Sequence, residues 1–118
     1  MGKFQDLKVW QRSMDLTVRI YSITEKYPKH EQFSLTNQTR RSAYSIPMNI
    51  SEGCGRRSDK EFVRFLDIAL GSGFELETQL IIGFRLNYLS DKEFSELNEE
   101  TIEIQKMLGG LMKKYTKI

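Results

Sequence analysis

Apolar residues recur at spacings of three and four along almost the whole chain, and no segment alternates in the manner of a strand. This pattern predicts four helices, at about 7–25, 35–52, 59–86 and 91–115, and therefore an all-α protein. Adjacent helices joined by short corners run antiparallel, so we expect an up-down-up-down four-helix bundle. The third helix is long, about 43 Å at 1.5 Å per residue. Residues 1–118 fit a single domain, because the length is that of one typical domain.

Local signals mark the ends of these helices. Pro28 cannot continue the first helix, and Ser34 is a candidate N-cap for the second. Two copies of "SDKE", beginning at Ser58 and Ser90, read as capping boxes, in which the serine hydroxyl accepts a free amide and the glutamate reaches back. Asn87 can adopt the left-handed conformation that closes the third helix.

A proline lies inside the second predicted helix. Pro47 removes the hydrogen bond to the Ala43 carbonyl, so we expect a kink there, with the small side chain of Ala43 easing the clash. Use of the freed carbonyl as a ligand is the weaker alternative.

The corner "EGCGRRSDKE" that follows holds two glycines and two arginines. Gly53 or Gly55 can supply the positive φ that ends a helix. The amides of this turn, together with Arg56 and Arg57, could instead hold a phosphate. No strand precedes the glycines, so neither a P-loop nor a Rossmann loop fits. We favour a structural corner and keep the anion site as the alternative.

The first and third predicted helices each carry two apolar rows where a bundle needs one. Such surface indicates either deep burial or a subunit interface, and we favour the interface because a chain of 118 residues has little protein to cover it. The candidate interface residues are Trp10, Met14, Tyr21, Val63, Leu70, Phe74 and Ile81.

Glu77 falls between the two apolar rows of the third helix and needs a partner, because an unpaired buried carboxylate costs several kcal/mol. Arg41 is the first candidate for a buried polar pair with Glu77, and Arg40 is the second. Arg40 also shares a helix face with Tyr44, on whose ring its guanidinium can stack.

Composition excludes several classes of protein. The single cysteine, Cys54, excludes an internal disulfide and is typical of a reducing compartment. No apolar signal segment is visible at the amino terminus, and no apolar run approaches the ~20 residues of a membrane span. We therefore expect a cytoplasmic protein with no membrane partner.

Catalytic and metal-binding patterns are also missing from the sequence. His30 is the one histidine, and no Ser-His-Asp set can be built around it with any specificity. A di-iron bundle would need Glu-x-x-His on two helices, and the sequence contains none. We expect no enzyme activity, no metal and no cofactor.

The net charge of +2 is small, but its distribution is uneven. Residues 40–64 hold six Lys and Arg against three Asp and Glu, so this segment is the most basic for its length. A local basic excess is a weak indication of a polyanionic partner.

Long stretches of the chain, "FQDLKVWQ", "QTRRSAYSIPMNISEG", "SDKEFVRFLDIALGSGFELETQL" and "LNYLS", resemble the four-helix-bundle proteins encoded in 23S rRNA intervening sequences. The resemblance implies an antiparallel bundle assembled as a ring-like homopentamer. It also implies kinship with the accessory variability proteins of diversity-generating retroelements, which are nucleic-acid-binding partners of a reverse transcriptase.

Two functions remain open. The first is a non-enzymatic homo-oligomer, expected to be a pentamer, that binds RNA or DNA through a basic belt, and whose partners could include a reverse transcriptase or another protein. The second is a protein-interaction or purely structural oligomer without a nucleic-acid role. The candidate nucleic-acid-binding residues are Arg40, Tyr44, Arg56, Arg57, Lys60 and Arg64.

Overall fold

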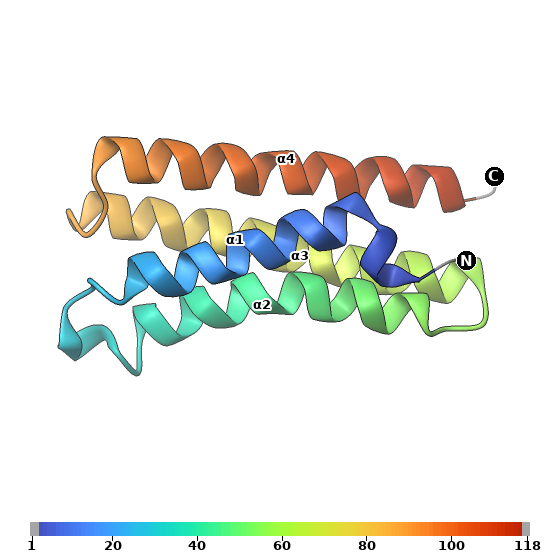
Figure 1. Ribbon diagram of the computed structural model, residues 1–118, viewed down its shortest axis with the longest axis horizontal. Helices are drawn as coiled ribbons and strands as arrows, with labels where there is room; N and C mark the ends of the chain where they lie inside the picture. Colours follow the sequence, from blue (N-terminus) through green and yellow to red (C-terminus); the bar gives the residue numbers. More distant parts are fainter. Residues whose placement is uncertain (1–2, 117–118) are drawn as a thin grey trace.

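Four α-helices lie side by side along one long axis, and each runs antiparallel to the next along the chain (Figure 1). In this computed structural model, which describes residues 3–116, they are α1 (Lys8–Thr24), α2 (Leu35–Cys54), α3 (Asp59–Arg85) and α4 (Asp91–Tyr115). One 3-10 turn precedes α1, at Phe4–Asp6, and another precedes α2, at Lys29–Glu31. No strand occurs in the described residues, so the predicted all-α bundle is confirmed.

The core runs along the axis between the helices, because each helix directs one apolar row inward. Full burial of a Leu or Ile side chain stabilises a fold by about 1.5–3 kcal/mol, so this row supplies the main driving force. The largest fully buried aliphatic side chains are Ile20 of α1, Ile46 and Ile50 of α2, Leu66, Leu76 and Leu80 of α3, and Leu97, Ile104 and Leu108 of α4.

Ion pairs join α4 to α1 and to the connection that follows it. Each pair is at least partly open to solvent, and exposed pairs contribute roughly 0–1 kcal/mol. They therefore set the register of the two helices more than they stabilise the fold. The three pairs are Arg12–Glu100, Arg19–Glu96 and Lys26–Glu93.

The two "SDKE" segments begin helices as predicted, but only one forms the complete capping box. At Ser90 the side-chain oxygen accepts the Glu93 amide at 3.1 Å, and the Glu93 carboxylate accepts the Ser90 amide at 3.0 Å. At Ser58 the hydroxyl accepts the Glu61 amide at 3.1 Å, whereas the Glu61 carboxylate pairs with a neighbouring arginine instead. Asn87 follows α3 with φ 65°, which confirms the predicted left-handed cap.

Ser34 occupies the N-cap position of α2, as predicted, but its hydroxyl accepts no backbone amide at the helix start. The Glu31 carboxylate takes that role. Its Oε1 lies 3.4 Å from the Leu35 amide nitrogen, and its Oε2 accepts the Tyr88 hydroxyl at 2.9 Å. The hydrogen bond from Tyr88 is the main cause that lowers the pKa of Glu31 below its ordinary value. Glu31 thus links the α1–α2 connection to the α3–α4 corner.

Pro47 lies inside α2, which remains one helix from Leu35 to Cys54. The carbonyl oxygen of Ala43, which loses its helical donor to the proline, is 3.1 Å from the hydroxyl oxygen of Thr17 in α1. The freed acceptor is therefore satisfied from the neighbouring helix, and it is not available as a ligand. The bend at Pro47 stays a prediction.

The glycines of the α2–α3 corner do not use positive φ, so that part of the prediction is wrong. No described glycine has a positive φ, and Gly55 closes α2 at φ −81°. Gly53 is needed for a different reason, since a Cβ there would lie 2.9 Å from the Phe65 Cβ and 3.1 Å from the Phe62 ring. Close approach of α2 and α3 excludes a side chain at this position.

Candidate nucleic-acid interface

The fold collects basic residues from three separate segments at one end of the bundle. The start of α1, the α2–α3 corner and the end of α4 all lie at this end (Figure 1). Within described residues 3–8, 52–64 and 110–116, eight Lys and Arg residues stand against four Asp and Glu. The whole chain carries +2, so the remainder is net acidic. We call this set the basic end: Lys3, Lys8, Arg56, Arg57, Lys60, Arg64, Lys113 and Lys114.

Phe65 orders two of these cations. The guanidinium carbons of Arg56 and Arg64 lie 4.7 and 4.6 Å from the centroid of its ring. Arg56 also pairs with Glu52 at 2.8 Å, and Arg64 pairs with Glu61 at 3.2 Å. Both ion pairs are partly exposed and therefore weak, so a phosphate can compete for either guanidinium. Phe65 keeps both side chains close to one position while they remain accessible.

Arg57 and Lys60 complete the corner. Both are exposed, and neither forms an ion pair with any of the residues that the structure describes. Their charges are therefore not compensated by a direct contact with a carboxylate, so both are candidate phosphate contacts.

Sequence reasoning missed the four lysines outside residues 40–64. Lys8 and Lys114 line one apolar depression between α1 and α4, so residues more than a hundred positions apart share a surface. The predicted up-down-up-down topology contained this signal, because it places the start of the first helix beside the end of the fourth.

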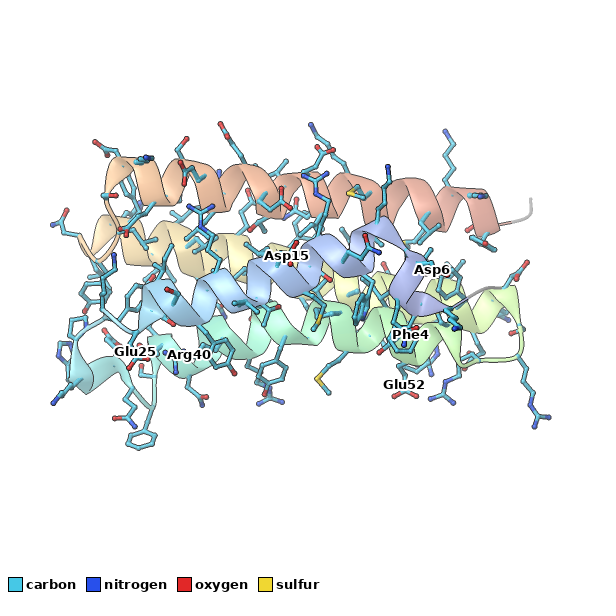
Figure 2. The ribbon with its side chains drawn as sticks, in the orientation of Figure 1. Phe4, Asp6, Asp15, Glu25, Arg40 and Glu52 are labelled. Atoms are coloured by element: carbon cyan, nitrogen blue, oxygen red, sulfur yellow. The ribbon has the colours of Figure 1, made fainter. Side chains whose placement is uncertain are left out.

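Arg40 does not belong to the basic end. It precedes Cys54 by 14 residues on α2, which is about 21 Å along a helix axis. Figure 2 shows Arg40 beside Glu25, at the end of the molecule opposite Glu52. The Arg40 guanidinium donates to the Thr24 hydroxyl at 2.8 Å and to Glu25 at 3.1 Å. It fastens α2 to the end of α1.

The predicted stacking of Arg40 on Tyr44 is also wrong. The guanidinium lies over the ring of Tyr21 from α1, at 4.7 Å from its centroid, because its hydrogen-bond acceptors all come from that helix and its end. Tyr44 is 38% exposed on α2, away from the corner. The structure therefore separates Arg40 and Tyr44 from Arg56, Arg57, Lys60 and Arg64, which it brings together.

The predicted buried pair of Glu77 and Arg41 is wrong as well. Glu77 accepts a hydrogen bond from the Gln105 side-chain nitrogen of α4 at 2.9 Å, and it is only partly buried. A neutral amide is sufficient for a carboxylate that keeps contact with water. Arg41 is exposed and lines a polar groove between α2 and α3, together with Ser45 and Glu75.

The candidate interface residues are covered to different degrees. Phe74 is 53% exposed, and Met14 and Tyr21 are about two fifths exposed. Trp10 packs against the core and meets the ring of Phe4 edge-on, with centroids 5.3 Å apart. The partly buried members of the set are Trp10, Val63, Leu70 and Ile81. A single subunit leaves part of this surface uncovered.

Burial raises the pKa of the Cys54 thiol, which disfavours the reactive thiolate. Among the residues the structure describes, no three His, Cys, Asp or Glu side chains gather as metal ligands would. Nor does any described helix combine the length and apolar character needed to cross a bilayer.

Comparison with known proteins identifies the family. The model of the family described as "23S rRNA-intervening sequence protein" matches residues 5–110. A crystal structure from Bacteroides thetaiotaomicron, of a protein with unknown function from the S23 ribosomal protein family, is similar to this chain with a TM-score of 0.81 and 30% identity. The similarity covers 89% of this chain and 98% of that one. No curated protein matches. The chain belongs to the 23S rRNA-intervening sequence protein family.

Proposed function

We propose that copies of this chain associate and bind RNA or DNA through their basic ends, without catalysing a reaction. The observation that carries the proposal is the concentration of eight cations against four carboxylates at one end of a nearly neutral chain. Phosphate contacts supply most of the affinity in non-specific nucleic-acid binding, and they need clustered Lys and Arg more than any particular fold. A cytoplasmic location is part of the proposal, because a chain with a single cysteine can form no internal disulfide and suits a reducing compartment.

Association of several copies would increase the affinity of the basic end for a polyanion. A local excess of four positive charges binds weakly alone, whereas several copies in one assembly present it repeatedly to one polyanion. Exposed apolar side chains support association, among them Phe74 at 53% exposure and Val18 at 67%. By its family resemblance we take the assembly to be a ring-like pentamer.

A salt titration tests the binding. The logarithm of the affinity for a structured RNA should fall linearly with the logarithm of salt concentration, and Arg57→Ala or Lys60→Ala should each reduce the slope by about one. Lys92→Ala is the matched control, because Lys92 is exposed but lies at the opposite end, at the start of α4. No binding at about 50–100 mM salt, or equal slopes for all three variants, would contradict the proposal.

A mass measurement tests the association. Sedimentation of the unaltered protein should give a mass several times 13.9 kDa, and Phe74→Asp should lower it by placing a charge on the exposed apolar surface. Glu99→Asp is the control, since this exposed position on α4 keeps its charge. A monomer at micromolar concentration would contradict the association.

A protein-interaction or structural oligomer without nucleic acid is the second candidate. The exposure of Phe33 at 87% and Met48 at 59% favours it, because both are large apolar side chains outside the basic end. A reverse transcriptase, the partner that the family resemblance implies, is one protein that could occupy such a surface. Intact association with no salt-dependent binding would favour this candidate.

A further inference from the structure

A pocket opens at the basic end between the start of α3 and the end of α4. Its volume is about 400 Å³, within the range of small-molecule and cofactor sites. Its lining combines an aromatic ring, an aliphatic side chain, a cation, a carboxylate and a hydroxyl, from Tyr115, Val63, Lys60, Asp59 and Thr116. The proposed phosphate contacts do not involve the aromatic ring, the carboxylate or the hydroxyl.

The Tyr115 ring is held in place by a contact on the core side. It meets the ring of Phe62 edge-on, with centroids 5.1 Å apart and planes at 87°, and Phe62 itself is 1% exposed. An edge-on contact orients the ring without using it as a parallel stacking partner. The Lys114 ammonium lies 5.9 Å from the Tyr115 centroid. An anchored aromatic ring with cations near it, here Lys60 in the same pocket lining and Lys114, is one arrangement by which proteins hold single-stranded nucleic acid.

The polar lining fits the edge of a base. The Asp59 carboxylate only accepts hydrogen bonds, so it can receive an amino group of adenine, cytosine or guanine. Uracil and thymine carry no amino group. The Thr116 hydroxyl donates to the Met112 carbonyl at 2.7 Å, which leaves its oxygen as a further acceptor. Both groups therefore favour an amino-bearing base, because the N3–H donor of uracil and thymine lies between two carbonyl oxygens that these acceptors repel.

We propose that this pocket takes one unpaired, amino-bearing base of a single strand, stacked on Tyr115, with a neighbouring phosphate on Lys60 or Lys114. The inference rests on the proposed nucleic-acid binding and adds the class of substrate. A base inside a duplex is stacked on both faces and cannot enter, so the pocket selects single-stranded segments or overhangs. The basic end supplies affinity, and the Tyr115 pocket supplies the preference for unpaired bases.

Fluorescence anisotropy with labelled oligo(A), oligo(U) and a blunt duplex tests this preference. Tyr115→Leu should weaken binding of oligo(A) by roughly tenfold and leave the duplex unchanged, while Tyr115→Phe retains the ring and the affinity. The salt slope should not change, because stacking releases no counterions. Asp59→Asn should reduce the difference between oligo(A) and oligo(U), since an amide can also donate.

Photocrosslinking of the unaltered protein keeps the test independent of the stability of Tyr115→Leu. A strand carrying bromocytidine should give an adduct that mass spectrometry maps to Tyr115. Adducts confined to other residues would overturn the inference, and so would a Tyr115→Leu variant that loses equal affinity for the strand and for the duplex. The proposed nucleic-acid binding would still stand if Arg57→Ala and Lys60→Ala reduced the salt slope. Adenosine monophosphate competing as well as the strand would overturn it too, because the site would then be one for a free nucleotide.

Discussion

The hydroxyl oxygen of Thr17 lies 3.1 Å from the carbonyl oxygen of Ala43, the acceptor that Pro47 leaves without a helical donor. The same hydroxyl lies 2.7 Å from the Ser13 carbonyl of its own helix, so its single proton is shared between the two helices. A defect in the hydrogen bonding of α2 is thus compensated by a side chain of α1. This contact explains how a buried proline is accommodated in the middle of a bundle helix.

Thr17→Val should destabilise the fold by about 1–2 kcal/mol, because it removes the hydroxyl at nearly constant volume and leaves the Ala43 carbonyl unsatisfied. In a Pro47→Ala background the loss should shrink, since the substituted residue has a backbone N–H to donate. Urea unfolding of the single and double variants measures this coupling. Thr78→Val is the control, because the exposed Thr78 hydroxyl bonds only its own helix. Equal effects of Thr17→Val in both backgrounds would refute the compensation.

Substitutions at Tyr27 and Gly83 should also be coupled, because the two residues are in close contact. A Cβ at Gly83 would lie 2.5 Å from the Tyr27 hydroxyl, so Gly83→Ala should cost about 1–3 kcal/mol. The Tyr27 hydroxyl is buried and has no hydrogen-bond partner among the described residues, so Tyr27→Phe should be neutral or stabilising. In that background Gly83→Ala should cost clearly less, because the nearest atom is gone. Thermal unfolding of the unaltered chain, the two single variants and the double variant measures this coupling. Strictly additive losses of stability would contradict the contact between Gly83 and Tyr27.

Tyr27 also predicts how stability responds to alkaline pH. Burial, with smaller contributions from Glu93 and Tyr88, raises the pKa of Tyr27 from 10.0 to about 12. The unfolded chain then releases this proton first, so stability is complete below about pH 10 and falls as pH rises toward 12. The steepest contribution is about 1.4 kcal/mol per pH unit. Urea unfolding at several pH values should show that the free energy of unfolding falls less steeply with pH for Tyr27→Phe than for the unaltered chain. Parallel declines for the two proteins would contradict this role of Tyr27.

The serines at the helix starts should differ in importance. Ser90→Ala should cost about 1 kcal/mol, because it opens the complete capping box with Glu93. Ser34→Ala should change stability by less than about 0.5 kcal/mol, since Ser34 caps no amide. Glu31→Ala should cost more than Ser34→Ala, because it removes both the Leu35 contact and the Tyr88 hydrogen bond. Denaturation midpoints measure all three, and a large loss for Ser34→Ala would reverse this assignment.

Local sequence signals were reliable wherever the physics is local. Asn87 takes the left-handed conformation, and Ser58 and Ser90 begin helices, because each effect involves residues within one turn. Ser34 is the N-cap residue of α2, as predicted, but the local pattern did not show that its side chain would cap no amide. The acceptor at that helix start comes from Glu31, which is held by Tyr88 from a distant part of the chain.

Polar partners were the least predictable part. Helical spacing placed Arg40 on the face of Tyr44 and Glu77 toward Arg41, but each side chain turned to a different helix. A long flexible side chain chooses among acceptors whose positions depend on how the helices pack, and their energies differ by about 1 kcal/mol or less. Periodicity alone does not resolve such differences.

The sequence by itself determined the four helices, their ends to within two residues and their antiparallel order, because periodicity, prolines and caps act over a few residues. Only the tertiary structure decided which residues from distant segments lie on the same surface. It placed Lys8 beside Lys114 at the same end of the bundle as Arg57, held Arg40 at the other end, and opened the pocket beside Tyr115. The physical reason is that helix formation depends on near neighbours in the chain, whereas charge clusters and pockets depend on how whole helices pack.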